Sequence, residues 1–170
     1  GYGLMSEACD YDLPFLVKHC DVFYIGGTKV GAMMGEAVVF SGMKAPKYFF
    51  TNVKRHGALL AKGRMLGIQF DTLFTNNLYF KISKHAIDMA IRIRSIFTKH
   101  GIKIAYNSPT NQQFVSLSPT LYDALSKNVA FEIWERKSDD EIICRFVTSW
   151  ATKETEIEAL DKELSKLLKA

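Results

Sequence analysis

Two short apolar runs near the start of the chain predict two buried strands. Val22–Ile25 and Ala37–Phe40 lie on either side of a Gly-Gly-Thr-Lys turn and a segment of small residues. Residues 10–20 predict a short helix ahead of the first strand, because Asp12 can cap it and Pro14 falls in its first turn, where proline is tolerated. A short helix that leads into an apolar strand is typical of an α/β sheet whose strands are buried on both faces.

Helical periodicity dominates the middle of the chain. Apolar residues recur with helical spacing from about residue 52 to 74, although three glycines in that range weaken the prediction. A stronger pattern covers residues 79–100 and ends at Gly101, which is placed as a C-terminal cap. We expect this long helix to bridge two lobes.

The pattern changes to short β-like runs after Gly101. Residues 131–135 and 142–147 flank a polar turn and predict a β-hairpin. Thr152 is placed to cap a last helix that ends near Leu168 and carries one apolar stripe for packing on a sheet. The other elements expected in this half are strands over 102–106 and 113–117 and a helix over 119–126.

The order of these elements predicts an α/β fold class with three parts. Residues 1–75 have the pattern of the end of a parallel α/β domain, residues 76–100 form a linking helix, and residues 101–170 form a smaller α+β domain. The chain starts at Gly1 without a leader, an initiator methionine or a first strand. We therefore expect it to be the C-terminal portion of a longer protein.

Composition narrows the class of protein. The chain is 48% hydrophobic and 24% charged, as in soluble globular proteins, and no apolar run reaches the roughly 20 residues of a membrane helix. Its net charge of +4 is scattered, so nucleic acid is not an expected partner. Cys9, Cys20 and Cys144 lie far apart, and neither they nor the histidines have metal-ligand spacing. This usage favours reduced thiols in a cytoplasmic protein without a metal site.

Lys29 is the first candidate for chemistry. It ends the Gly-Gly-Thr-Lys turn and is the only residue between Asp21 and Glu36 that is charged at neutral pH. We expect it at the edge of a buried sheet, in a loop whose glycines allow other atoms to come close. Burial lowers the pKa of a lysine amine, and a neutral amine can attack a carbonyl to form a Schiff base. The alternative is a solvated lysine in a loop between two strands.

Two arginines are further candidates. Arg145 lies inside an apolar strand, where its guanidinium suits bidentate capture of a carboxylate. The alternative is that it alternates outward into water while Cys144 and Phe146 face inward. Arg55 begins the helix predicted from residue 52, where a guanidinium and helix amides could share an anion such as phosphate. Its alternative is an exposed arginine beside His56.

Four stretches together resemble a known family. They are DVFYIGGTKVGAMMGEAVVF, RHGALLAKGRMLGIQFDTLF, SPTNQQFV and RFVTSWAT. In this order they resemble the C-terminal half of low-specificity L-threonine aldolases, which belong to the threonine aldolase/aromatic amino acid β-eliminating lyase group of fold-type-I pyridoxal-phosphate enzymes. The resemblance implies that residues 1–75 are the C-terminal part of the cofactor-binding large domain and that residues 101–170 are the small domain.

The resemblance also implies roles for individual residues. Lys29 matches the family lysine that forms the Schiff base with pyridoxal phosphate, and Thr28 beside it is implied to contact the cofactor. Arg55 best matches the arginine that opens the glycine-containing helix and reaches the cofactor phosphate. Arg145 matches the arginine that binds the substrate carboxylate from the small domain. No residue is implied as a metal ligand.

The implied activity is that of a lyase that cleaves L-threonine or L-allo-threonine to glycine and acetaldehyde. The family's phosphate loop, its aspartate at the pyridine nitrogen and its substrate histidines would all precede Gly1. We therefore expect this chain to lack independent activity, and to self-associate or pair with the missing half. Two alternatives remain open: another fold-type-I reaction, such as β-elimination or transamination, and a non-catalytic remnant that only associates with other chains.

Overall fold

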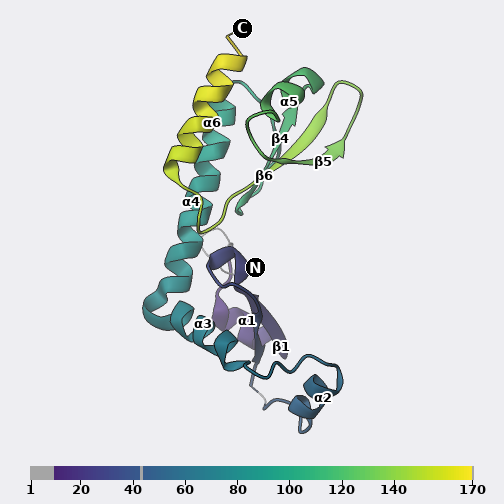
Figure 1. Ribbon diagram of the computed structural model, residues 1–170, viewed down its shortest axis with the longest axis vertical. Helices are drawn as coiled ribbons and strands as arrows, with labels where there is room; N and C mark the ends of the chain where they lie inside the picture. Colours follow the sequence, from purple (N-terminus) through teal and green to yellow (C-terminus); the bar gives the residue numbers. More distant parts are fainter. Residues whose placement is uncertain (1–9, 43, 170) are drawn as a thin grey trace.

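One long helix, α4 (Leu78–Lys99), connects the two halves of the molecule. A computed structural model describes residues 10–42 and 44–169, so the prediction for Cys9 lies outside the described residues. Figure 1 shows a lower lobe around the N-terminal end of α4 and an upper lobe around its C-terminal end. Gly101 follows α4 with φ +73°, which confirms it as the residue that ends the helix.

The lower lobe is built on a pair of antiparallel strands. β1 (Val22–Gly26) and β2 (Glu36–Phe40) pair from Val22 opposite Phe40 to Gly26 opposite Glu36. Helix α1 (Leu13–His19) precedes them, and the side chain of Asp12 accepts a hydrogen bond from the backbone N–H of Phe15 at 2.9 Å. Both strands and the capped helix are therefore confirmed, but the two strands run antiparallel to each other and not parallel as expected.

In the described residues these strands are buried on one face only, which differs from the two-sided burial of a complete α/β sheet and agrees with the exposed apolar surface expected of a portion that pairs with another chain. Ile25 is buried, but Val22, Tyr24 and Val38 are exposed along the same pair of strands. One face of the pair packs on α3 and α4, and the other carries apolar side chains in solvent. An apolar run predicts a strand, but it does not predict what covers the strand's second face.

The helix predicted over 52–74 is also wrong in its extent. The structure has two helices here, α2 (Phe49–Arg55) and α3 (Arg64–Phe74), separated by an eight-residue connection. Gly57 has φ +69°, its N–H bonds to Lys54 O at 3.0 Å, and the Ala58 N–H bonds to Val53 O at 2.9 Å. This left-handed closure ends α2, because glycine adopts the conformation without steric cost.

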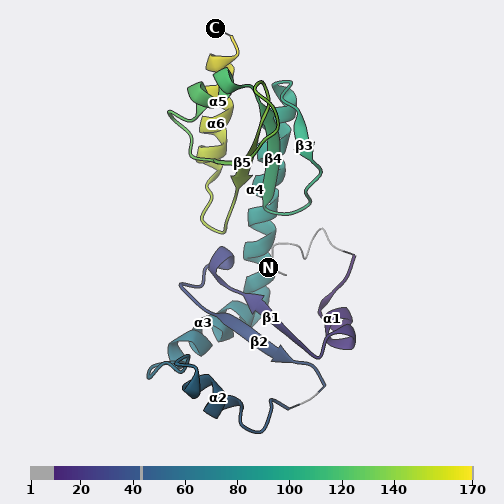
Figure 2. The same cartoon turned by 90° about the vertical axis from the view of Figure 1, so that its right-hand side faces the viewer.

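A tight reversal turns α3 into α4. Asn76 and Asn77, in the 3₁₀ turn η3 (Thr75–Asn77), have φ values of 53° and 59°. Asparagine tolerates this left-handed region better than most residues. The turn lets α3 and α4 lie against each other with the β1–β2 pair beside them (Figure 2).

The upper lobe is a four-stranded antiparallel sheet backed by helices. Its strand order is β3-β4-β6-β5, and the predicted hairpin is the β5–β6 pair. The elements are β3 (Ile104–Tyr106), β4 (Gln112–Leu117), α5 (Pro119–Leu125), β5 (Glu132–Arg136), β6 (Ile142–Val147) and α6 (Glu154–Leu167). One face of the sheet lies on α4 and α6 (Figure 2).

The start of α6 differs from the prediction by one residue. Lys153 is the N-cap, and Glu156 accepts a hydrogen bond from its backbone N–H at 2.9 Å. The hydroxyl of Thr152 instead accepts from the backbone N–H of Ser149 at 3.0 Å. The predicted apolar stripe is confirmed, because Ile157, Leu160 and Leu164 are buried.

Helix α4 contributes to both hydrophobic cores. Its first half places Tyr79 and Ala86 in the lower core with Ile25, Val30 and Phe70. Its second half supplies the upper core, where the α4 residues are Met89, Ile93 and Phe97. The helix therefore fixes the two lobes relative to each other.

Candidate active site

The Lys29 loop has a close-packed backbone. β1 ends at Gly26, and the next residues form the 3₁₀ turn η2 (Thr28–Val30), in which Lys29 is the central residue. A Cβ added at Gly27 would lie 2.7 Å from Ala32 Cβ and 2.9 Å from Phe70 Cζ. Only glycine fits at position 27 without moving the core beneath the loop.

Three distant groups hold this loop by hydrogen bonds to its backbone. The buried Tyr79 hydroxyl on α4 donates to Gly26 O at 2.9 Å. The side-chain oxygen of Gln69 on α3 accepts from the Met33 N–H at 2.7 Å. The Trp150 N–H, from the segment after β6, donates to Lys29 O at 3.3 Å. Both lobes therefore fix the backbone that carries Lys29.

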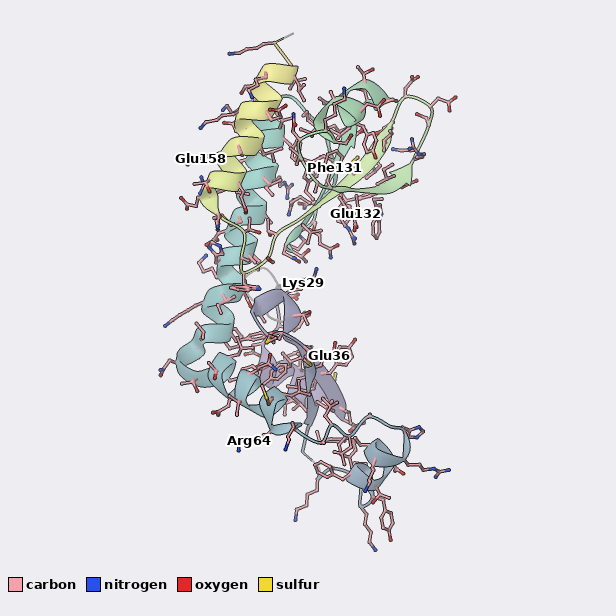
Figure 3. The ribbon with its side chains drawn as sticks, viewed as in Figure 1. Lys29, Glu36, Arg64, Phe131, Glu132 and Glu158 are labelled. Carbon is pink, nitrogen blue, oxygen red and sulfur yellow. The ribbon has the colours of Figure 1, made fainter. Side chains whose placement is uncertain are left out.

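The side chain of Lys29 lines a small cavity. The cavity holds about 280 Å³, and its other lining residues are Tyr24, Gly26, Thr28, Val30, Glu36 and Tyr79. Figure 3 shows Lys29 at the end of the lower lobe that is nearest the upper lobe, with Glu36 further down the same side. Lys29 and Thr28 are both exposed, so the burial expected around Lys29 is not provided by the described residues.

Arg145 lies on the sheet face that points away from α4 and α6. Cys144 and Phe146 are buried on the opposite face, as the strand alternation predicts. The side chain of Arg145 is only 26% exposed, however, so it does not extend freely into water. It donates to Gln112 Oε1 at 3.1 Å and to Glu132 Oε2, and its guanidinium lies 5.3 Å from the centre of the Trp134 ring.

The segment after β6 connects Arg145 with the Lys29 loop. The buried Thr148 hydroxyl donates to Ala86 O on α4 at 2.6 Å, and the Thr148 N–H donates to Asn111 O at 3.0 Å. A ring nitrogen of His85 lies 2.8 Å from Thr152 O. The segment is thus fixed to α4 on both sides of Trp150, whose N–H bonds to Lys29 O.

The structure does not bring Arg55 to this site. Arg55 is the last residue of α2 rather than the first residue of a helix. Figure 1 shows α2 at the end of the lower lobe that is farthest from the upper lobe. The glycine-containing helix is α3, and Arg64 opens it. Sequence reasoning missed this boundary, because Gly57 and Gly63 were interpreted as interruptions within one helix.

The sequence predictions also did not include three residues that bond to the Lys29 loop or to Arg145. Tyr79 and Trp150 carry no local signal, because each bonds to a residue more than fifty positions away. Glu132 had a signal: the predicted hairpin, once the irregularity near Trp134 is counted, puts it directly opposite Arg145.

A larger cavity lies away from Lys29. It holds about 650 Å³ between α4, α6 and the end of β6. Its two carboxylates are already engaged, since Glu156 accepts from Lys153 N–H and Glu163 accepts from the Asn128 amide at 2.9 Å. Cys144 lies close by in the upper core, where burial raises the pKa of its thiol to about 11. We assign no chemistry to this cavity.

The described residues contain no helix that is both long and apolar enough to cross a membrane. Residues 10–42 and 44–169 also contain no cluster of three or more histidine, cysteine or acidic side chains arranged to hold a metal ion.

Comparisons with known proteins find relatives that are similar to this chain over most of its length. The chain is 26% identical over 151 residues to the low-specificity L-threonine aldolase of Pseudomonas sp. (strain NCIMB 10558), covering 88% of this chain and 43% of that protein. The corresponding protein of Pseudomonas aeruginosa is 24% identical over 146 residues, covering 85% of this chain and 41% of its own length. No family model matches the chain.

Solved structures also superpose on most of this chain. Threonine aldolase from Leishmania major superposes with a TM-score of 0.88 and 35% identity, covering 94% of this chain and 46% of that one. An 8-amino-7-oxononanoate synthase from Francisella tularensis superposes with a TM-score of 0.55 and 15% identity over 80% of this chain and 42% of its own, which is a likeness of fold alone.

The fold is that of the C-terminal portion of the fold-type-I pyridoxal-phosphate enzymes, as predicted. Among these, the chain resembles the low-specificity L-threonine aldolases, and this predicted resemblance is confirmed over most of its length. The chain spans less than half the length of the relatives it matches.

Proposed function

We propose that this chain carries the covalent lysine and the carboxylate-binding arginine of a pyridoxal-phosphate lyase that cleaves L-threonine or L-allo-threonine to glycine and acetaldehyde. The observation that carries the proposal is the bond between Trp150 N–H and Lys29 O, because it joins the Lys29 loop to the segment that continues the Arg145 strand. Two groups that must act on one substrate are thereby held by one connected backbone.

The residues at the cavity fit a covalent anchor for the cofactor. Lys29 is an exposed primary amine on a backbone that both lobes hold in place, and Thr28 offers a hydroxyl on the same cavity. When bound, pyridoxal phosphate supplies the electron sink for cleavage. Arg55 is not part of this proposal, because α2 holds it away from the Lys29 loop.

The role of Arg145 in this proposal is to bind and orient the substrate carboxylate. A planar guanidinium matches a carboxylate in two-point geometry, and fixing that group sets which bond at Cα can break. The stacking on Trp134 and the bond to Gln112 limit the directions the guanidinium can take. A small-molecule amino acid is therefore the proposed substrate.

The remaining functional proposals concern the assembly. We propose that the chain works in the cytoplasm as part of an oligomer or together with residues that correspond to the rest of its relatives. The exposed side chains of Val22, Tyr24 and Val38 on the β1–β2 pair support a covering partner for that face. We retain the domain division 1–75, 76–100 and 101–170, with α4 as the linking helix.

Covalent labelling tests the proposal. The chain is incubated with pyridoxal phosphate and then with borohydride, both alone and mixed with the N-terminal half of the Leishmania major relative, and the modified peptide is mapped. We expect the label at Lys29, loss of the label in Lys29→Ala, and no such loss in the control Lys81→Ala on the exposed face of α4. Absence of label at Lys29 both in the chain alone and in the mixture with the N-terminal half would overturn the proposal.

Product analysis separates the alternatives. Glycine and acetaldehyde from threonine support aldol cleavage, whereas β-elimination or transamination gives an oxo acid instead. A non-catalytic protein predicts that pyridoxal phosphate leaves the melting temperature unchanged, because only a ligand that binds the folded state raises it.

A further inference from the structure

Arg145 already has a carboxylate against it. Glu132 on β5 lies directly opposite Arg145 on β6 in the strand register, and Arg145 Nη2 donates to Glu132 Oε2. On its other side, Arg145 Nη1 donates to Gln112 Oε1 at 3.1 Å, and the Trp134 ring lies 5.3 Å away. Figure 3 shows Glu132 on the side of the upper lobe that also faces the region of Lys29.

The two members of the Arg145–Glu132 ion pair differ in how firmly the rest of the protein holds them. Arg145 is 26% exposed and has contacts with Gln112 and Trp134 in addition to Glu132, whereas the side chain of Glu132 is 67% exposed. An exposed glutamate with one partner can turn into solvent by changing its rotamer, and water then solvates its charge. Arg145 is thus the fixed member of the pair and Glu132 the replaceable one.

The pair leaves part of the guanidinium unsatisfied. Arg145 Nε is buried and has no hydrogen-bond partner among the described residues. A guanidinium presents Nε–H and one Nη–H as a fork that fits both oxygens of one carboxylate. Glu132 engages this fork only at Nη2. A free carboxylate that bonds to both nitrogens therefore satisfies a donor that Glu132 leaves without a partner.

We propose that Glu132 is a resident carboxylate that occupies the ligand position of Arg145 and is displaced when an amino-acid carboxylate binds. This inference rests on the proposed function, which assigns the substrate carboxylate to Arg145. It makes Glu132 a specificity-determining residue. Each ligand must compete with Glu132, and the displaced negative charge stays beside the site, where it disfavours ligands that bring a second carboxylate.

A purely structural role for Glu132 makes the opposite prediction. If Glu132 only held Arg145 in place, neutralising it would let the guanidinium move and would weaken carboxylate binding. If Glu132 competes with the ligand, neutralising it strengthens binding. The variant Glu132→Gln keeps the shape of the side chain, and exposed ion pairs contribute little to stability, so the fold is retained.

The experiment titrates the full chain with N-acetylglycine, a monocarboxylate whose blocked amine cannot react with the cofactor. Binding is measured by isothermal titration calorimetry in the wild type and in every variant, and the Arg145 Nε–H resonance of ¹⁵N-labelled protein reports the site in the proteins that keep Arg145. We expect Glu132→Gln to lower the Kd about 2- to 5-fold, as expected for removal of one exposed charged competitor. The Kd for malonate, which carries two carboxylates, should decrease by a larger factor in Glu132→Gln than the Kd for N-acetylglycine. The matched control is Glu135→Gln on the same strand, which pairs with Tyr106 at 2.9 Å and should leave Kd unchanged.

The outcomes separate this inference from the proposed function. An unchanged or higher Kd in Glu132→Gln, with binding that Arg145→Lys abolishes, overturns the competitor role of Glu132 and leaves Arg145 as the carboxylate site. Equal binding in wild type and Arg145→Lys overturns the role of Arg145. No binding in either wild type or Glu132→Gln overturns both, because the competitor would then have been removed without effect.

Discussion

The backbone N–H of Trp150 donates to the carbonyl of Lys29 at 3.3 Å, across 121 positions of sequence. The Trp150 ring also covers Gly31, where a Cβ would lie 3.8 Å from Trp150 Cδ2 and where φ is +97°. The segment that follows the Arg145 strand thus bonds to the Lys29 loop and covers it. The conformation of that loop depends on how firmly residues 148–150 are attached to α4.

Loosening this attachment should be measurable. Thr148→Val removes the hydroxyl that donates to Ala86 O at 2.6 Å, and we expect a loss of about 1 kcal/mol in the free energy of unfolding. Amide exchange at Trp150 should become faster. The control Thr98→Val removes a similar bond to Arg94 O on the exposed face of α4 and should cost less than half as much. Equal losses in urea denaturation would contradict the prediction.

Adjacent glycines provide a matched test of packing under the Lys29 loop. Gly27→Ala forces a methyl group to within 3 Å of Ala32 and Phe70, so we expect a loss of about 1–3 kcal/mol in stability. Gly26→Ala meets no atom within 4 Å and should change stability by less than about 0.5 kcal/mol. Thermal or urea unfolding measures both variants, and a Gly27→Ala protein as stable as Gly26→Ala would refute the packing described.

The end of α4 predicts a dependence of stability on acid. Hydrogen bonds from Lys99 at 2.8 Å and from His100 at 2.7 Å lower the pKa of the Asp161 carboxyl. The unfolded chain therefore binds this proton more readily, and the stabilisation is present near neutral pH and lost as pH falls through the carboxyl's folded pKa.

Asp161→Asn should remove that contribution. We expect the variant to unfold at lower urea concentration than wild type at about pH 7, and the difference to shrink at about pH 3. The control Asp88→Asn, from an exposed pair with Lys84 on α4, should show a smaller difference at neutral pH. If the stability difference between Asp161→Asn and the wild type increased in acid, the predicted direction of the pH dependence would be contradicted.

Cysteine reactivity tests the upper core. Burial raises the pKa of Cys144 to about 11, whereas Cys20 is only half-buried. At about pH 8 the thiolate fraction of Cys144 is more than about 100-fold below that of an ordinary cysteine. We expect iodoacetamide to label Cys20 first and Cys144 only after unfolding, as read from separate peptides by mass spectrometry. The raised pKa also means that stability falls as pH rises from about 9 towards 11.

Local patterns predicted the elements better than their surroundings. Asp12, Pro14 and Gly101 act within a few residues of themselves, so the sequence carries the whole signal for the ends of α1 and α4. Gly57 and Gly67 look alike in sequence, yet one closes α2 in the left-handed region and the other lies inside α3. A Cβ added at either glycine would meet no atom within 4 Å, so close packing does not distinguish the two positions.

The residues of the candidate site also differ in how far the sequence alone predicts them. Lys29 and Arg145 are charges in apolar stretches of sequence, and the family resemblance selects them as candidate site residues. Tyr79 and Trp150 bond to the backbone of the Lys29 loop, at Gly26 O and Lys29 O, and come from distant elements that only the fold brings together. The exposure of Lys29 agrees with the alternative that the sequence left open, a solvated lysine in a loop between two strands.

The sharing of α4 between two cores restricts where this protein can change length. Tyr79 and Ala86 face the lower core, and Met89, Ile93 and Phe97 face the upper one, on a single unbroken helix. One residue inserted between Ala86 and Met89 would rotate one core by about 100° against the other and shift it by about 1.5 Å. The bond between the Trp150 N–H and Lys29 O would be lost. Insertions are therefore compatible with function in surface connections, such as the one between α2 and α3, but not in the middle of α4.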